Sequence, residues 1–93
     1  MKEIPKFHET FIPLLETLKS GELIKGRELS IRVRDNYYAD LSDDQLSKKL
    51  KSGGNVLLNR INWGKSYLKM GKFAFYPQRG YVQITEKGKQ ALE

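Results

Sequence analysis

The chain has 93 residues, no cysteine and a formal net charge of +6. This length suits one small domain over residues 1–93, and without cysteine neither disulfides nor a cysteine-based metal site can stabilise it. No apolar run approaches the roughly 18 residues of a membrane span and the N-terminal residues lack the apolar core of a signal peptide, so we expect a cytoplasmic protein.

The positive charge is concentrated in the second half of the sequence. Residues 1–47 hold seven basic and nine acidic side chains, whereas residues 48–93 hold ten and two. Between Asp44 and Glu86 there are eight Lys or Arg residues and no acid. Such segregation attracts polyanions, although a basic surface can also serve only to keep a protein in solution. The arrangement of the residues in the second half of the sequence distinguishes between polyanion binding and a surface that serves only solubility.

Apolar side chains recur at helical spacing in two segments of the first half. The first covers residues 7–18, where Pro13 predicts either a kink or a helix that gains its strongest part near Ile12. The second covers residues 26–39. Its expected inward-facing side chains are Leu29, Ile31, Val33 and Tyr37.

A short helix and a long helix follow. Ser42 with Gln45 three residues later forms a capping-box pattern, which predicts a short helix that ends near Leu50. Residues 51–54 include two glycines and predict a loop. Residues 55–70 then read as the longest helix of the chain, closed by Gly71.

After Gly71 the apolar period changes from helical to alternating. Residues 73–77 and 81–85 are aromatic and β-branched runs around Gly80, which predicts a β-hairpin with Pro77 at an edge or at the turn. A terminal helix over residues 86–92 is expected, with Thr85 as its cap. This order predicts an α+β fold of the winged helix-turn-helix type, with three to four helices, a C-terminal hairpin wing and a short terminal helix.

The long helix divides into three sectors at 100° per residue. Gly64 lies in the core-facing sector, where it allows a neighbouring helix to approach closely. The expected core side chains of this helix are Leu57, Leu58, Ile61 and Leu68. The adjoining sector consists of Val56, Arg60, Trp63 and Tyr67.

The third sector carries amides, a hydroxyl and an ammonium group, but no carboxylate. It consists of Asn55, Asn59, Asn62, Ser66 and Lys69. Asparagine is a poor helix former, yet in the major groove it can pair bidentately with adenine, while Ser and Lys reach phosphate or guanine. The sector therefore predicts a DNA-reading face, and the alternative is a merely polar surface with accidental asparagines.

Further basic side chains are candidates for contacts with the DNA backbone. Arg79 at the hairpin tip suits a minor-groove or phosphate contact, or else is a solvent-exposed turn residue. Arg60 either contacts phosphate or braces Trp63. Trp63 itself is expected to anchor the helix against the hairpin, in preference to stacking on a base. The lysines expected to neutralise phosphates are Lys48, Lys49, Lys51 and Lys65.

Several motifs, in order, resemble the N-terminal domain of Mrr-type restriction proteins. They are Asn-Arg-Ile-Asn-Trp (59–63), Tyr-Leu-Lys-Met-Gly (67–71), Pro-Gln-Arg-Gly-Tyr (77–81) and Ile-Thr-Glu-Lys-Gly (84–88), together with Ile-Pro (4–5) and Phe-Ile-Pro-Leu-Leu (11–15). The resemblance covers nearly the whole chain. It implies a winged helix that binds double-stranded DNA in front of a nuclease domain that cleaves modified DNA. The chain stops where that nuclease would begin, so we expect either an excised domain of a longer parent or a stand-alone relative.

The sequence offers no sign of chemistry of its own. A nuclease of the related type needs paired carboxylates with a Glu-x-Lys or Gln-x-Lys sequence to hold Mg²⁺, and no such pattern occurs. His8 lacks an obvious partner. The only cluster of acids is Asp35, Asp40, Asp43 and Asp44, of which the last two belong to a helix start. We expect no enzyme activity, no cofactor and no metal.

Other functions remain open at this point. Winged helices also act as protein-interaction or dimerisation modules, including homodimers, and such a module would use Trp63, Tyr76 and Tyr81 as an apolar patch. A stand-alone transcriptional regulator is a related alternative. Single-stranded nucleic acid is a third possibility, because the hairpin is aromatic and bases stack on aromatic rings.

Overall fold

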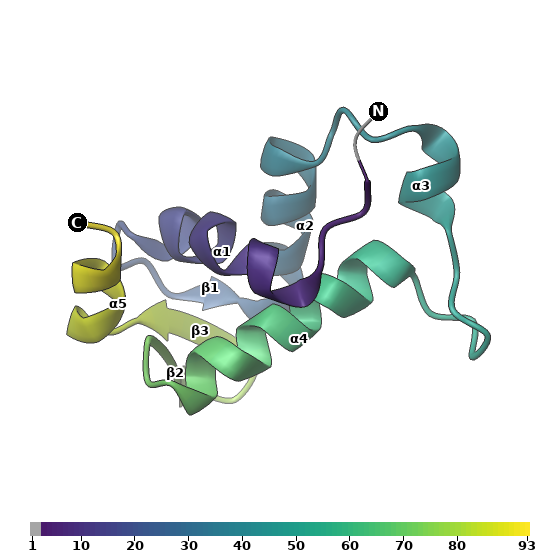
Figure 1. Ribbon diagram of the computed structural model, residues 1–93. Coiled ribbons are helices and arrows are strands. Elements are labelled where there is room, and N and C mark those ends of the chain that lie inside the picture. Colours follow the sequence, from purple (N-terminus) through teal and green to yellow (C-terminus); the bar gives the residue numbers. More distant parts are fainter. Residues whose placement is uncertain (1–2) are drawn as a thin grey trace.

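The structure is a computed structural model that describes residues 3–93, and it combines helices with one small antiparallel sheet (Figure 1). Residues 1 and 2, which the expected single domain includes, lie outside the described residues. The elements are η1 (Phe7–Thr10), α1 (Phe11–Leu18), β1 (Ile24–Lys25), α2 (Gly26–Tyr37), α3 (Asp43–Ser47), α4 (Val56–Met70), β2 (Ala74–Gln78), β3 (Tyr81–Ile84) and α5 (Glu86–Ala91). The expected α+β class is therefore correct. The sheet and α5 lie at one end of the packed helices α1, α2 and α4, and α3 lies at the other end (Figure 1).

The sheet has three strands in the order β1–β3–β2, and both pairs are antiparallel. The sequence pattern did not indicate β1, because two residues are too few to show alternation. The predicted hairpin is confirmed. Its Pro77 lies in β2, which the strand order leaves at an edge, and the register shifts between Phe75 and Gln78. An edge position tolerates proline because no inner ladder bond needs its missing N–H.

The first helical segment begins as a 3₁₀ helix and becomes an α-helix at Phe11. Pro13 is the third residue of that α-helix. A proline in the first turn needs no kink, because the first N–H groups of a helix have no intrahelical partner. Of the two predictions for residues 7–18, the one that placed the strongest helix near Ile12 is therefore correct.

Helix α2 carries its buried residues at Leu29 and Val33, as expected. Tyr37 was expected to face inward, and this is wrong, since the side chain is 41% exposed. Positions spaced by four residues drift by about 40° at each step around a helix, so the third member of the row turns away from the core. The half-buried Tyr38 packs against the core instead.

The capping boxes and caps follow the sequence closely. The Ser42 hydroxyl accepts a 3.2 Å hydrogen bond from the Gln45 N–H, and the Gln45 side chain accepts a 3.0 Å bond from the Ser42 N–H. Thr85 caps α5 by accepting from the N–H of Gly88 at 3.1 Å. Helix α3 ends at Ser47 and not near Leu50, because Lys48 turns to an extended conformation.

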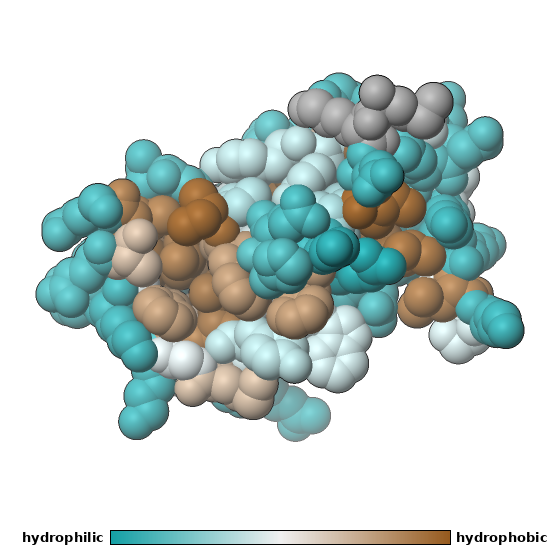
Figure 2. Space-filling model, viewed as in Figure 1, coloured by the Kyte–Doolittle hydropathy of each residue, from teal (hydrophilic) through white to brown (hydrophobic). Residues whose placement is uncertain are grey.

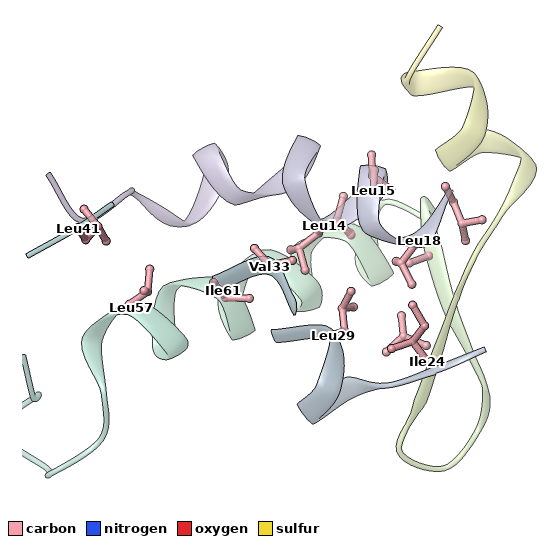
Figure 3. Close-up of a cluster of buried hydrophobic side chains, with 13 residues drawn as sticks. Leu14, Leu15, Leu18, Ile24, Leu29, Val33, Leu41, Leu57 and Ile61 are labelled. Carbon is pink, nitrogen blue, oxygen red and sulfur yellow. The ribbon is translucent and has the colours of Figure 1, made fainter. Parts of the chain in front are cut away.

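The core lies between α1, α2, α4 and the sheet (Figure 3). From α4 it takes the side chains of Leu57, Ile61 and Leu68. Gly64 lies against the N-terminal helical segment, where a Cβ atom would collide with Oγ1 of Thr10 and lie 3.0 Å from Cδ1 of Leu14. The predicted close approach at Gly64 is confirmed, and it fixes which face of α4 points outward.

Candidate nucleic-acid interface

The outward face of α4 carries the amide-rich sector. Asn62, Ser66 and Lys69 are exposed and Asn59 is half-buried. The local reason is periodicity, because the residues that point into the core leave these positions on the opposite side of the helix. A shallow, open depression of about 270 Å³ lies in this face, and its lining residues are Asn59, Asn62, Trp63 and Ser66. The depression contains no carboxylate.

Asn55 differs from the other asparagines of the sector. It is the N-cap of α4, where its side-chain oxygen accepts a 3.0 Å hydrogen bond from the N–H of Leu58. Its amide nitrogen donates to the carbonyl oxygen of Leu46 at 2.7 Å. The side chain is half-buried and joins the start of α4 to α3. The structure therefore accounts for Asn55 as a capping residue.

Trp63 does not anchor α4 to the hairpin, so that prediction is wrong. Its side chain is 53% exposed and its ring lies 6.3 Å from the ring of Tyr67, measured between centroids. The hairpin packs instead against another part of α4, where the Lys69 ammonium lies 5.0 Å from the ring centroid of Tyr76. Sequence periodicity placed Trp63 beside the amide sector but could not say which side of that sector the hairpin covers.

A second depression separates α2 from α4, and cations line it. Its volume is about 430 Å³, and it is formed by Arg27, Ser30, Ile31, Arg34, Leu58, Asn62 and Lys65. The Ser30 hydroxyl lies 3.1 Å from Oδ1 of Asn62 and 3.2 Å from the carbonyl oxygen of Gly26, and its proton is shared between these acceptors. The amide-rich face of α4 and the first half of α2 are thus hydrogen-bonded to each other.

Lys65 is half-buried in this groove, and its ammonium donates a 2.9 Å hydrogen bond to the carbonyl oxygen of Gly26. Burial lowers the pKa of Lys65, because desolvation disfavours the charged form. None of the residues that line the groove is a carboxylate. An approaching anion would therefore find a positive charge that no acid of the groove neutralises.

Sequence reasoning missed Arg27 and Arg34. They lie seven residues apart on α2 and line the groove together. The spacing of two helical turns was the signal that could have found them, had the cations of the first half been traced onto helix faces. Arg34 also pairs with the neighbouring Asp35, with Nε and Oδ1 3.0 Å apart.

The hairpin turn lies beside the same groove. The N–H of Gly26 donates to the carbonyl oxygen of Gly80 at 2.9 Å, so the turn packs against the first residue of α2. Gly80 has a φ of +83°, a conformation that glycine adopts without strain. The neighbouring Arg79 is exposed. The structure thus brings Arg79, Lys65 and the start of α2 together.

Lys48, Lys49 and Lys51 are exposed in the connection that leads into α4. They therefore lie at the opposite end of α4 from the hairpin (Figure 1). Within residues 3–93, the ion pairs involve other cations, namely Lys19, Arg32, Arg34 and Lys89. The eight cations of the acid-free stretch thus have no ion-pair partner in the part of the chain that the structure describes.

Arg60 lies on the other flank of α4. Its guanidinium donates a 3.1 Å hydrogen bond to the carbonyl oxygen of Pro5 and so fixes the N-terminal segment. It borders a hollow of about 580 Å³ that also contains Glu3 and Glu9. It also lines a shallower one with Trp63. Arg60 is therefore a candidate cation whose surroundings include carboxylates in a shared hollow.

A comparison with known protein families identifies the family of this chain. The model of the Mrr N-terminal domain matches residues 7–93. The chain belongs to the Mrr N-terminal domain family. Searches of curated proteins and of solved structures found no match.

This Mrr N-terminal domain shows no assembled metal site in residues 3–93, where no group of three or more His, Cys, Asp or Glu side chains could hold an ion. Over the same residues, no helix combines the length and the apolar character that crossing a bilayer requires. Figure 2 shows pale and light brown side chains over the middle of α4 and a group of hydrophilic side chains over the adjoining N-terminal segment. The chemistry that this face offers is hydrogen bonding, positive charge and aromatic surface.

Proposed function

We propose that this chain is a double-stranded DNA-binding module of the winged helix-turn-helix type. In this arrangement α4 enters the major groove, and the turn between β2 and β3 contacts the neighbouring backbone or minor groove. The order of α1, α2, α3 and α4 followed by a hairpin supports the proposal, as does a strand before α2 that completes the sheet. With 15 residues, α4 is about 22 Å long, and the major groove is wide enough to admit an α-helix.

One observation carries this proposal. The cations of the acid-free stretch have no ion-pair partner within residues 3–93, although the molecule holds eleven acids in all. Exposed cations in a protein with many acids usually have carboxylates within reach. Cations without an ion-pair partner, next to a face of amides, suit a partner that supplies regular negative charge and hydrogen-bonding edges.

The proposal assigns different roles to the two kinds of side chain. Asn59 and Asn62 read base edges, and Ser66 and Lys69 contact phosphate or guanine beside them. The lysines of the connection before α4 neutralise phosphates at one end. Along the groove between α2 and α4 the cations are Arg27, Arg34 and Lys65, and Arg79 lies in the hairpin turn.

Membership of the Mrr N-terminal domain family supports a role in a restriction system. We propose that it supplies target recognition to an Mrr-like restriction endonuclease, with the nuclease domain in a longer parent chain and the complex in the cytoplasm. Under this proposal the module itself has no catalytic role and needs no cofactor. A stand-alone transcriptional regulator would use the same DNA-binding face.

A second candidate function is a protein-interaction or dimerisation module. The observation that favours it is the set of exposed apolar side chains on α4: Trp63, Tyr67 and Met70. Sedimentation separates the two. A monomer that binds duplex DNA fits the leading proposal, whereas a homodimer indifferent to DNA fits the alternative.

The test is binding to a fluorescent mixed-sequence duplex between about 50 and 200 mM salt. If five to seven phosphates are neutralised, the plot of log affinity against log salt should have a slope of about −4.5 to −6.3. Arg79→Ala should make the slope shallower by about 1. Lys89→Ala removes a cation from α5 that is paired with Glu86, and it should leave the slope unchanged. Affinity that is independent of salt contradicts the proposal, and a single-stranded competitor that displaces the duplex efficiently contradicts the preference for double strands.

A further inference from the structure

Trp63 has an exposed ring that the fold does not require. It lies on α4 one turn after Asn59, and more than half of its surface is open to solvent. A tryptophan exposed to this extent leaves much apolar surface in water, which folding alone does not explain. Its position beside the amide-rich sector, in one depression with Asn59, Asn62 and Ser66, indicates that it acts on whatever that face binds.

The Trp63 ring belongs to a row of aromatic rings. The Tyr67 ring lies 6.3 Å from that of Trp63 and 4.7 Å from that of Phe7, with the last two rings stacked at 25°. Phe7 comes from η1, which packs directly against α4. The neighbour of the Trp63 ring, Tyr67, is therefore held in place by Phe7 from a second element of the fold, η1. An apolar surface in a defined position can discriminate between ligands, whereas a freely moving one cannot.

The neighbours of Trp63 provide complementary hydrogen-bonding groups. Asn59, Asn62 and Ser66 line the same depression of about 270 Å³. Asn62 accepts a hydrogen bond from Ser30, which orients its amide and leaves its NH₂ group to act as a donor. The Asn59 side chain has no hydrogen bond within residues 3–93, so both its amide oxygen and its amide nitrogen are available.

This combination of amide and apolar surface matches one base pair. In the major groove an adenine shows an acceptor at N7 and a donor at N6, which an Asn amide satisfies with two hydrogen bonds. Thymine shows an acceptor at O4 and the C5 methyl group, which only an apolar surface contacts favourably. Neither G nor C presents both a site for the amide and a methyl group.

We infer that α4 reads an A·T-containing step, with the adenine edge bound by Asn59 and the thymine C5 methyl group packed on the ring of Trp63. This inference rests on the proposed binding of duplex DNA and adds the base and the atom that are recognised. Asn62 donates to a neighbouring acceptor such as thymine O4. The row from Phe7 through Tyr67 keeps the indole in place, so Tyr67 is a positioning residue.

The test replaces thymine by uracil, which deletes the methyl group and keeps every hydrogen-bonding atom of the base. Two short alternating duplexes are compared, one of A and T and the other of A and U, by fluorescence anisotropy in the same buffer. Wild type should bind the thymine duplex more tightly, by about fourfold for each methyl group buried. Trp63→Ala should bind both duplexes equally. Trp63→Phe should keep part of the difference, because it retains a flat apolar ring.

A matched control is Phe75→Ala. Phe75 is an aromatic residue of similar exposure, at 42%, and it follows the buried Ala74 in β2, so it points to the other face of the sheet. This variant should keep the full preference for thymine. Loss of the preference in Phe75→Ala as well would overturn the assignment of the methyl contact to Trp63.

The outcomes separate this inference from the proposed function. Binding of neither duplex would mean that the proposed function fails. Equal binding of both duplexes by wild type would overturn the inference alone. A third comparison uses G·C duplexes with and without C5-methylated cytosine, because that base carries the same methyl group. The inference expects no gain there that depends on Trp63, and a full gain would assign the methyl contact to cytosine and overturn the assignment to thymine.

Discussion

The ammonium of Lys65 lies 2.9 Å from the carbonyl oxygen of Gly26, and this contact joins α4 to the first residue of α2. The N–H of the same Gly26 donates to the carbonyl oxygen of Gly80 in the hairpin turn, also at 2.9 Å. One glycine therefore connects the long helix, the preceding helix and the hairpin. All three elements carry candidate DNA-binding groups. The contacts that Gly26 makes within 3 Å therefore help to set the relative positions of these groups.

Lys65 predicts a specific dependence of stability on pH. Burial lowers its pKa below the ordinary value of 10.5, so between the lowered value and 10.5 the unfolded chain binds more protons than the folded chain. The contribution of Lys65 to the free energy of unfolding therefore rises with pH across that window. Urea unfolding at a series of pH values below 10.5 should show this rise in wild type relative to Lys65→Met, which cannot titrate.

Two tyrosines also affect the dependence of stability on pH. Burial raises the pKa of Tyr38 and of Tyr76, and Glu9 adds to the effect at Tyr38. Their contribution to stability falls as pH rises from about 10.0 through the raised values, in wild type and in Lys65→Met alike, so it cancels in the difference between the two proteins. Parallel curves for wild type and Lys65→Met would contradict the role assigned to burial.

The two asparagines predict a loss of sequence preference. Asn59→Ala combined with Asn62→Ala should weaken binding to a duplex selected by wild type by about 1–3 kcal/mol more than binding to random duplex, because bidentate contacts discriminate between bases. Asn36→Ala removes an exposed asparagine from α2 and is the matched control. Equal losses on the selected and random duplexes would mean that the amides do not read sequence. Competition between the two duplexes measures this directly.

Asn55 should behave differently from Asn59 and Asn62. Because it caps α4 and holds Leu46, Asn55→Ala should reduce the free energy of unfolding by about 1 kcal/mol or more. The folded variant should retain the sequence preference of wild type. Ser42→Ala, which removes the cap of α3, provides a comparison of similar kind. A changed sequence preference with an unaltered free energy of unfolding would instead show that Asn55 contributes to reading the DNA sequence.

Gly64→Ala should destabilise the protein although alanine favours helices. The added Cβ atom would meet Thr10 and Leu14, and overpacking of this kind costs about 1–3 kcal/mol. Thr10→Ala in the same chain should recover part of the loss, because it removes the atom that is met first. A gain of about 1 kcal/mol, the intrinsic preference for Ala over Gly, would instead show that the helices do not approach closely at this point.

Much of the fold could be predicted because its signals are local. The caps at Ser42 and Thr85 depend on neighbours within three residues, and the edge position of Pro77 follows from its missing N–H. Gly64 was informative because glycine destabilises a helix interior relative to alanine. Close packing of a neighbouring helix is a reason for glycine at such a position. The alternation of apolar residues after Gly71 is also a local pattern, and it therefore predicted the hairpin correctly.

The candidate site was harder to predict because it depends on which elements meet. Trp63 was placed in the right sector, but its exposure depends on where the hairpin packs, and no local pattern contains that information. Arg27 and Arg34 became candidates only when α2 was found beside α4. The strand β1 exists because β3 offers it an edge, and its two residues carry no pattern of their own.

Backbone chemical-shift mapping with a short mixed-sequence duplex tests the central claim most directly, because it reports the binding surface residue by residue. The account predicts that the largest shifts occur along the outward face of α4 from Asn59 to Lys69, at Arg79 and Gly80, and at the start of α2. Residues of α1 and α5 should move little. Shifts centred on α1 or α5, or none at saturating DNA, would contradict the assignment of this face to duplex DNA.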